Sequence, residues 1–181
     1  TSSASAPKGG SVLKDKTVIV LANQNIVAVH KPIGSKPHTF KVPFEASALT
    51  VSPNEEHVLI GAEDGKIHVY KTSDILAESG EKISAAAVNV ISSQSAIITS
   101  FSYSPDGSSV AVSDSNRKIY VYDSATFAVK LDAWVYHTAK ILTVTWSPDG
   151  KHAASGGIDS NLEVWSVEFP KKHINFRNAH I

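Results

Sequence analysis

Residues 142–165 read LTVTWSPDGKHAASGGIDSNLEVW. The segment contains two tight-turn sequences, Ser147-Pro148-Asp149-Gly150 and Asp159-Ser160-Asn161. In the first of them proline presets a φ of about −65°, and Asp with Gly completes the turn. The runs around these turns are rich in Val, Thr, Leu and Trp, which favour strands. The segment therefore predicts three strands joined by two tight turns.

The same pattern occurs twice more, earlier in the chain. Ser52-Pro53-Asn54 and Ser104-Pro105-Asp106-Gly107 repeat the first turn, and the spacings from one proline to the next are 52 and 43 residues. An aromatic residue stands 17 positions after each proline, and a polar turn residue stands six positions before each aromatic: Asp64 and Tyr70, Asn116 and Tyr122, Asp159 and Trp165. A period of roughly 20–50 residues indicates a repeat architecture.

Each repeat has room for a fourth strand. The candidates are the less regular segments that follow the third strands: residues 85–91, 128–131 and 173–176. A polar insertion at residues 72–82 lengthens the first repeat, and we expect it to be a surface loop. Three further strands are predicted upstream, without a Ser-Pro turn: residues 17–21, 26–30 and 39–42. The sequence thus predicts an all-β chain of four-stranded antiparallel meanders.

These repeats suggest boundaries along the chain. We expect complete units over residues 46–92, 93–135 and 136–178, preceded by a partial unit over residues 16–45. The remaining residues at the two ends are interpreted separately: 1–15 as a flexible lead or a divergent first strand, and 179–181 as the start of a further unit. Because methionine is absent, we expect the chain to be processed or to be a piece of a longer protein.

Composition excludes several classes of protein. With 42% apolar residues among 181, the chain is expected to fold, and the 17 basic and 17 acidic side chains give no net charge that would favour a nucleic-acid partner. No apolar run approaches the roughly 18 residues of a membrane span, and the first ten residues do not resemble a secretory signal. The absence of cysteine removes disulfides, thiolate zinc sites and cysteine nucleophiles.

The sequence contains no motif that assigns a chemical activity. The eight histidines include no pair with metal-ligand spacing, and we expect His68 to be exposed and His137 and His180 to cap turns. The sequence has no Gly-x-Ser-x-Gly nucleophile motif, and Asp159-Ser160-Asn161 lacks the glutamate that closes a calcium loop. We therefore predict no catalytic, metal-binding or cofactor-binding residues and no enzymatic activity.

The repeats resemble the blades of WD-repeat β-propellers, and the third is the most similar. His137, Ser155, Asp159 and Trp165 stand where that family has a buried hydrogen-bonded chain of His, Ser, Asp and Trp, which implies a structural role for all four. The other repeats depart from the pattern at the corresponding positions: Val42, Ile60, Asp64 and Tyr70 in one, and Gln94, Val112, Asn116 and Tyr122 in the other. We expect those blades to depend on apolar packing.

Residues 16–181 also resemble the C-terminal propeller of the actin-interacting protein family, the WD-repeat cofactors of cofilin. The resemblance is carried by Gly61-Ala-Glu-Asp-Gly65, by Tyr103-Ser-Pro-Asp-Gly107 and above all by His137 to Trp165. It implies a non-catalytic, cytoplasmic scaffold of the actin cytoskeleton that promotes disassembly of cofilin-decorated actin filaments. The implied partners are actin filaments, cofilin and the remaining blades of the parent propeller, without nucleic acid or membrane.

Partner-binding residues are not identified by this resemblance. Trp134 and Tyr136, in a predicted loop between blades, are candidates for a contact surface or for packing between blades. Two alternative functions remain: a WD-repeat scaffold of an unrelated multiprotein complex, and an enzyme or ligand-binding propeller with a site in its central channel. The latter is disfavoured because no cluster of titratable residues recurs on the innermost strands.

Overall fold

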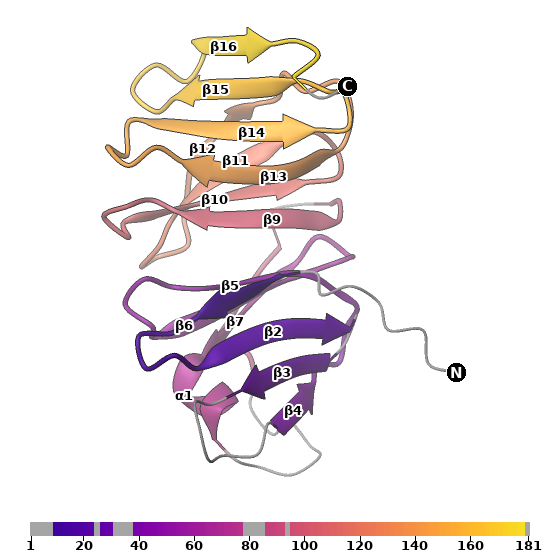
Figure 1. Ribbon diagram of the computed structural model, residues 1–181, viewed down its shortest axis with the longest axis vertical. Helices are drawn as coiled ribbons and strands as arrows, with labels where there is room; N and C mark the ends of the chain where they lie inside the picture. Colours follow the sequence, from indigo (N-terminus) through magenta and orange to yellow (C-terminus); the bar gives the residue numbers. More distant parts are fainter. Residues whose placement is uncertain (1–8, 24–25, 31–37, 78–85, 93–94, 180–181) are drawn as a thin grey trace. The chain divides into compact units, whose positions relative to one another are not determined.

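The computed structural model describes residues 9–23, 26–30, 38–77, 86–92 and 95–179. This part of the chain forms four antiparallel sheets of four strands each and one short helix (Figure 1). The predicted all-β fold is therefore confirmed. The chain divides into two compact units, residues 1–95 and residues 96–181, which are described in turn.

The first unit contains two sheets and the helix. One sheet has the order β1-β2-β3-β4: β1 (Gly10–Val12), β2 (Val18–Asn23), β3 (Ile26–His30) and β4 (His38–Lys41). The other has the order β5-β6-β7-β8: β5 (Ala46–Val51), β6 (His57–Ala62), β7 (Ile67–Lys71) and β8 (Asn89–Ile91). A buried apolar cluster that includes Leu21, Val29, Leu49 and Ile60 joins the two sheets.

Strand β1 changes the prediction of a partial unit at residues 16–45. Residues 10–12 pair with β2, so the first sheet has four strands, as in the alternative of a divergent first strand. The Ser11 hydroxyl accepts a hydrogen bond from the Val51 backbone N–H at 3.2 Å, which ties β1 to the end of β5. A Cβ at Gly10 would lie 3.0 Å from the Ile19 carbonyl oxygen, so this short strand favours glycine, a residue that gives no strand signal.

The polar insertion at residues 72–82 is not purely a loop. Its first residues form helix α1 (Thr72–Leu76), and the Ala77 backbone N–H donates to the Ser73 carbonyl at its end. Ile75 is buried in the core cluster of this unit and holds the single turn of helix against the sheets. One apolar residue among polar neighbours gives no helical periodicity, so the sequence did not reveal the helix.

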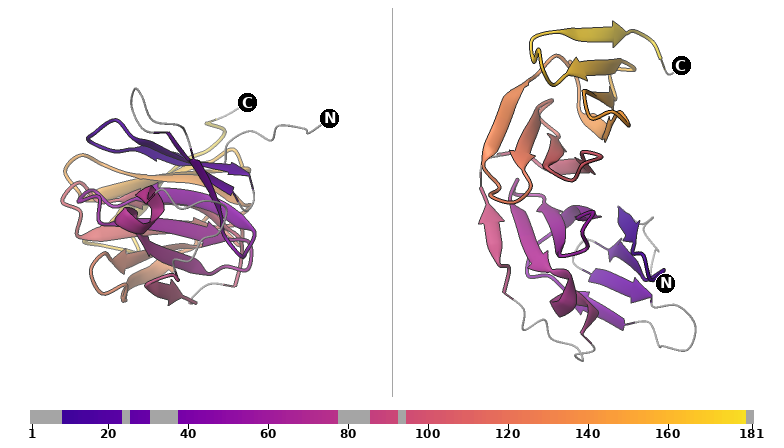
Figure 2. Two further views of the ribbon diagram at one scale, coloured as in Figure 1. Left: turned by 90° about the horizontal axis from the view of Figure 1, so that it is seen from below. Right: turned by 90° about the vertical axis from the view of Figure 1, so that its left-hand side faces the viewer.

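The second unit also contains two sheets. One has the order β12-β11-β10-β9: β9 (Ile98–Tyr103), β10 (Ser109–Asp114), β11 (Ile119–Asp123) and β12 (Val129–Trp134). The other has the order β13-β14-β15-β16: β13 (Ile141–Trp146), β14 (His152–Gly157), β15 (Leu162–Ser166) and β16 (His173–Phe176). Within this unit the sheets lie face to face (Figure 2).

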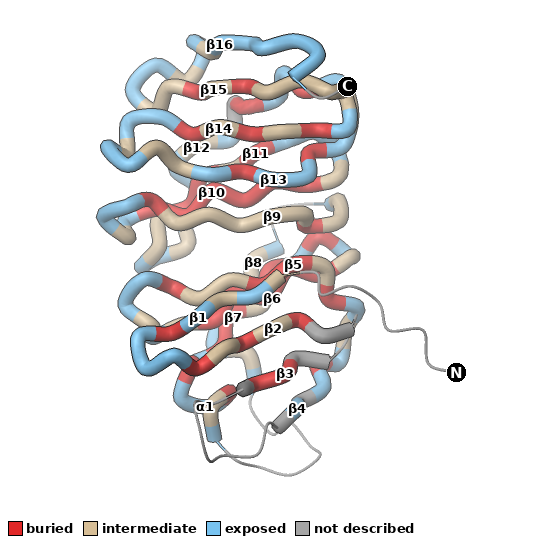
Figure 3. The backbone as a smooth tube through the Cα atoms, in the orientation of Figure 1, coloured by how far each residue is buried: buried red, intermediate tan, exposed pale blue. Residues whose placement is uncertain are grey.

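The core of the second unit lies between its two sheets. Trp134 at the end of β12 and Trp165 on β15 are both fully buried, and their rings stack with centroids 5.5 Å apart. Ala111, Ile119 and other apolar residues of both sheets complete the same cluster. Figure 3 shows buried positions along β10, alternating buried and half-buried positions along most of β14, and mainly exposed positions along the outer strand β16. Burial of this continuous apolar layer stabilises the pair of sheets.

The predicted Ser-Pro turns share one hydrogen-bond pattern. The Ser52, Ser104 and Ser147 hydroxyls donate to the side-chain oxygen of the Asn or Asp two residues later, at 2.6, 2.6 and 2.5 Å. The same hydroxyls accept from the backbone N–H five residues later, at 2.9, 3.0 and 3.0 Å. Each serine therefore helps to close the turn between the first and second strands of its sheet, where its side chain adds to backbone hydrogen bonds of the same turn.

Candidate functional site

His137, Ser155, Asp159 and Trp165 come together in the second unit. His137 lies between β12 and β13, Ser155 on β14, Asp159 in the turn before β15, and Trp165 on β15. The Trp165 Nε1–H donates to the Ser155 Oγ at 2.8 Å, and that Oγ lies 2.8 Å from the His137 Nε2. The His137 Nδ1 lies 3.1 and 3.0 Å from the two Asp159 carboxylate oxygens. The four side chains form one continuous hydrogen-bonded network.

The partners determine the direction of the hydrogen bonds in this network. A carboxylate only accepts, so the His137 Nδ1 carries the proton that faces Asp159. In the neutral imidazole the Nε2 then accepts the Ser155 hydroxyl proton, which leaves the Ser155 oxygen free to accept from Trp165. Donation runs from Trp through Ser and His to Asp, so each of these buried polar groups has a partner.

Asp159 is the anionic end of the network. Burial opposes ionisation of its carboxyl group, but hydrogen bonds from the Thr138 backbone N–H, the His137 ring and the Asn161 backbone N–H outweigh that cost. The pKa of Asp159 is therefore held below its ordinary value. At neutral pH the carboxylate is ionised, and it joins the loop of His137 to the turn between β14 and β15.

Gly157 belongs to the network although it has no side chain. A Cβ at this position would lie 2.9 Å from both the Asp159 Oδ1 and the His137 Nδ1, and 3.1 Å from the Lys140 carbonyl oxygen. Real Cβ atoms do not approach other atoms so closely, so only glycine lets the imidazole and the carboxylate meet above the backbone. The sequence analysis did not identify this residue, and the available signal was a glycine two positions before Asp159.

The Ser155-His137-Asp159 arrangement resembles the triad of a hydrolase but lacks access to a substrate. Ser155 and His137 are each 2% exposed, and the Ser155 oxygen already accepts the Trp165 N–H. A nucleophile must reach the reacting atom of its substrate, which a buried hydroxyl cannot do. What this arrangement can do is join the loop before β13 to the centre of the sheet.

The repeat at residues 46–92 uses apolar residues where that network stands. Val42, Ile60 and Tyr70 are buried in the core of the first unit. Asp64 is half exposed and pairs with Lys66 at 2.5 Å within its own turn. The hydrogen bond from Lys66 outweighs a small desolvation cost and lowers the pKa of Asp64. This carboxylate therefore stabilises a surface turn and contacts no histidine in the described part of the first unit.

The repeat at residues 93–135 uses a different buried carboxylate. Val112 and Tyr122 are fully buried, Asn116 is exposed, and the predicted position Gln94 lies outside the described residues. Asp114, at the end of β10, is 2% exposed and accepts from the backbone N–H groups of Asn116 and Lys118, at 2.8 and 3.0 Å. Burial raises the pKa of Asp114 despite these hydrogen bonds. The sequence analysis missed this residue because it stands two positions before the expected one.

Two segments of the chain match a known protein family. The family model described as "WD domain, G-beta repeat" matches residues 87–123 and 130–166. These two segments are WD repeats. Among solved structures, a chain in the crystal structure of the mitotic checkpoint complex superimposes with a TM-score of 0.73 at 15% identity, covering 91% of this chain and 50% of that one. That likeness supports the fold alone, a WD-repeat β-propeller.

Three curated relatives align along most of these WD repeats. The 66 kDa stress protein of Physarum polycephalum is 35% identical over 92% of the chain. The proteins named Actin-interacting protein 1 from Drosophila melanogaster and Caenorhabditis elegans are each 30% identical, over 96% and 97% of it. The aligned part is 26%, 27% and 28% of these relatives. The chain therefore spans about a quarter of their length.

Two predicted contact residues of the last WD repeat differ in exposure. Trp134 is fully buried against Trp165, so it packs between the sheets. Tyr136 is 43% exposed, and its ring stacks on His173 with centroids 3.9 Å apart. Of the two, only Tyr136 is available to a partner.

One histidine differs from the sequence-based prediction. His68 was expected to be exposed, but it is half-buried and stacks on Phe44 with ring centroids 3.8 Å apart. Desolvation lowers the pKa of His68. His180 lies outside the described residues. Within those residues no group of three His, Cys, Asp or Glu side chains could hold a metal ion, and no helix is long and apolar enough to cross a membrane.

Proposed function

We propose that this chain is a non-catalytic interaction scaffold within an actin-binding protein that promotes disassembly of cofilin-decorated actin filaments. The observation that carries the proposal is the alignment with proteins named Actin-interacting protein 1 over 96% and 97% of the chain. Its partners are actin filaments and cofilin, and its place of action is the actin cytoskeleton of the cytoplasm.

The structure is compatible with such a scaffold. The outer strand β16 is mainly exposed, while the hydrogen-bonded side chains of the last repeat are used inside the fold. Exposed apolar side chains such as Tyr136, Leu142 and Ile158 lie in or near the loops of that repeat. Aromatic and apolar side chains of this type are enriched where proteins bind one another.

Filament co-sedimentation tests the proposal. The 181-residue chain is mixed with actin filaments, with filaments saturated with cofilin, and with cofilin alone, and the chain and actin are quantified in pellet and supernatant. We expect the chain to pellet with decorated filaments more than with bare ones, and actin to shift from the pellet to the supernatant as chain is added. Cofilin without actin controls for sedimentation of the chain by itself.

Two outcomes would contradict the proposal. A chain that stays in the supernatant at every filament concentration does not bind actin, which would favour the alternative of a WD-repeat scaffold in another complex. A chain that pellets equally with bare and decorated filaments, without releasing actin, would contradict the part of the proposal that concerns cofilin.

A further inference from the structure

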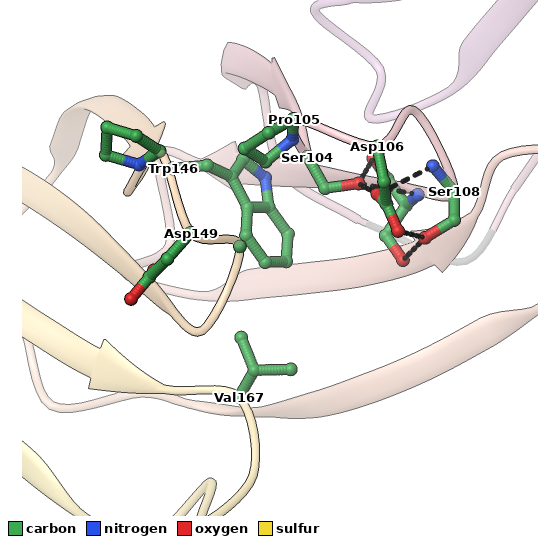
Figure 4. A pocket seen from close by; sticks show the side chains of 10 residues that line it. Ser104, Pro105, Asp106, Ser108, Trp146, Asp149 and Val167 are labelled. Atoms are coloured by element: carbon green, nitrogen blue, oxygen red, sulfur yellow. Dashed lines mark hydrogen bonds between the residues drawn. The ribbon is translucent and has the colours of Figure 1, made fainter.

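The second unit contains a pocket where the Ser-Pro turns of its two sheets meet, and we call it the interblade pocket. It has a volume of about 520 Å³ and is lined by residues that include Pro105, Asp106, Ser108, Trp146, Asp149 and Val167. Figure 4 shows Trp146 between Asp149 and the loop that carries Asp106, with Val167 pointing toward the indole ring. The volume is within the range of roughly 300–1,000 Å³ that is typical of ligand sites.

The apolar side of the interblade pocket is held rigidly. The Trp146 indole N–H donates to the Ser102 carbonyl oxygen at 2.9 Å, which fixes the ring at the end of β13. Trp146 and Val167 also pack against the buried core cluster of the unit. The half-buried ring therefore presents a preformed aromatic surface to the pocket. Binding of a ligand then carries little entropy cost for ordering this side chain.

The polar side of the pocket carries ionised carboxylates. The Asp106 Oδ1 accepts from the Ser104 hydroxyl and the Ser108 backbone N–H at 2.6 and 3.0 Å, and its Oδ2 accepts from the Ser108 hydroxyl at 2.8 Å. These hydrogen bonds, the one from Ser104 first, lower the pKa of Asp106 to about 2. A carboxylate has about four acceptor positions, and these three hydrogen bonds leave about one of them for a ligand.

The nearby cations leave most of the negative charge at Asp106. Lys130 donates to the Ser109 hydroxyl at the edge of the turn but is paired with Asp123 at 3.0 Å. Asp149 has a pKa lowered first by the hydrogen bond from the Ser147 hydroxyl, with smaller contributions from its basic neighbours Lys151 and His152. The charge of Asp149 is therefore partly offset, and Asp106 is the stronger partner for a cation.

An ionised carboxylate and a fixed indole in one pocket suit one class of side chain. We propose that the interblade pocket binds an arginine side chain from a partner protein, with the guanidinium stacked on Trp146 and paired with Asp106. A guanidinium is planar, remains charged, stacks on aromatic rings and can donate a charge-assisted hydrogen bond to the remaining acceptor position of Asp106. The inference rests on the pocket alone and does not depend on whether the partner is actin.

Nuclear magnetic resonance titration tests the inference on the ¹⁵N-labelled 181-residue chain. The probe is N-acetyl-arginine methylamide, and the control is N-acetyl-citrulline methylamide, which has the same shape without the charge. We expect the Trp146 indole N–H resonance to shift saturably with the arginine probe, and the citrulline compound to bind at least fivefold more weakly. An absent or non-saturable shift, or equal binding of the two compounds, would overturn the inference.

Charge-neutralising variants test the role of Asp106. Asp106→Asn should weaken binding of the arginine probe at least fivefold, Asp149→Asn should weaken it less, and Asp132→Asn, on β12 outside the pocket, should leave it unchanged. The turn should survive the first change, because Asn54 stands at the same position in the first Ser-Pro turn and accepts the same two hydrogen bonds. Unweakened binding to Asp106→Asn would overturn the inference.

Discussion

Replacing Asp159 by alanine should destabilise the second unit far more than replacing Asp64 by alanine destabilises the first. The Asp159 side chain is 4% exposed and accepts hydrogen bonds from His137, Thr138 and Asn161. The Asp64 side chain is 49% exposed and bonds only within its own turn, to Lys66, among the contacts described for it. The two residues occupy the same position in their repeats, so they form a matched pair.

The expected losses follow from these contacts. Asp159→Ala leaves the buried His137 Nδ1–H without its acceptor, and an orphaned buried donor costs about 1–3 kcal/mol. The Thr138 and Asn161 N–H groups lose an acceptor as well but lie nearer the surface, where water can replace it. Asp64→Ala removes an exposed ion pair, for which about 0–1 kcal/mol is usual.

Urea unfolding of the 181-residue chain measures both losses. Tryptophan fluorescence reports on the second unit because Trp134, Trp146 and Trp165 all lie there, and circular dichroism reports on the first unit as well. Asp159→Asn is the control of intermediate effect, since its amide oxygen can still accept one hydrogen bond. Equal losses for the two alanine variants would refute the conclusion that the network stabilises the last repeat.

Three further tests, two of them with a matched control variant, give distinct expectations. Gly157→Ala should cost roughly 1–3 kcal/mol in urea unfolding because its Cβ collides with the network, whereas Gly156→Ala, whose Cβ would lie 3.7 Å from its nearest neighbour, should be close to neutral. Arg117→Gly should stabilise the chain by about 0.5–1 kcal/mol, because Arg117 has a φ of 70°, which glycine adopts more easily than other residues. Lys118→Gly is the control and should destabilise the chain, because Lys118 does not have a positive φ. Desolvation lowers the pKa of His68, so the unfolded chain binds more protons below the ordinary value of about 6.5, and stability should fall as the pH is lowered from 7 to 5. His68→Phe should flatten that pH dependence in thermal unfolding, and an unchanged slope would contradict the assignment.

The repeat pattern allowed much of the fold to be predicted from the sequence. Serine, proline and Asp or Asn at a fixed distance from an aromatic residue define two turns and three strands, because those turns are closed by their own side chains. Strands β5–β7, β9–β11 and β13–β15 therefore lie where the local chemistry predicts them. Strand β1 was predicted only as one of two alternatives, and helix α1 was not predicted, because contacts with distant residues stabilise them, through Ser11 and Ile75 respectively.

For the candidate sites, too, the sequence predicted some features and tertiary structure decided others. The resemblance of the third repeat to WD-repeat blades indicated from the sequence which residues could form the network: His137, Ser155, Asp159 and Trp165. Tertiary structure decided that their atoms meet at 2.8–3.1 Å and are buried. It also decided that Gly157 must lack a side chain.

Only tertiary structure brings the turns at Asp106 and Asp149 to one pocket beside Trp146. These turns are 43 residues apart, and no property of either turn alone indicates the other. Turns and strand alternation depend on residues a few positions apart, which the sequence displays directly. Pockets and buried networks depend on how one sheet packs on the next, which is set by the apolar core between them.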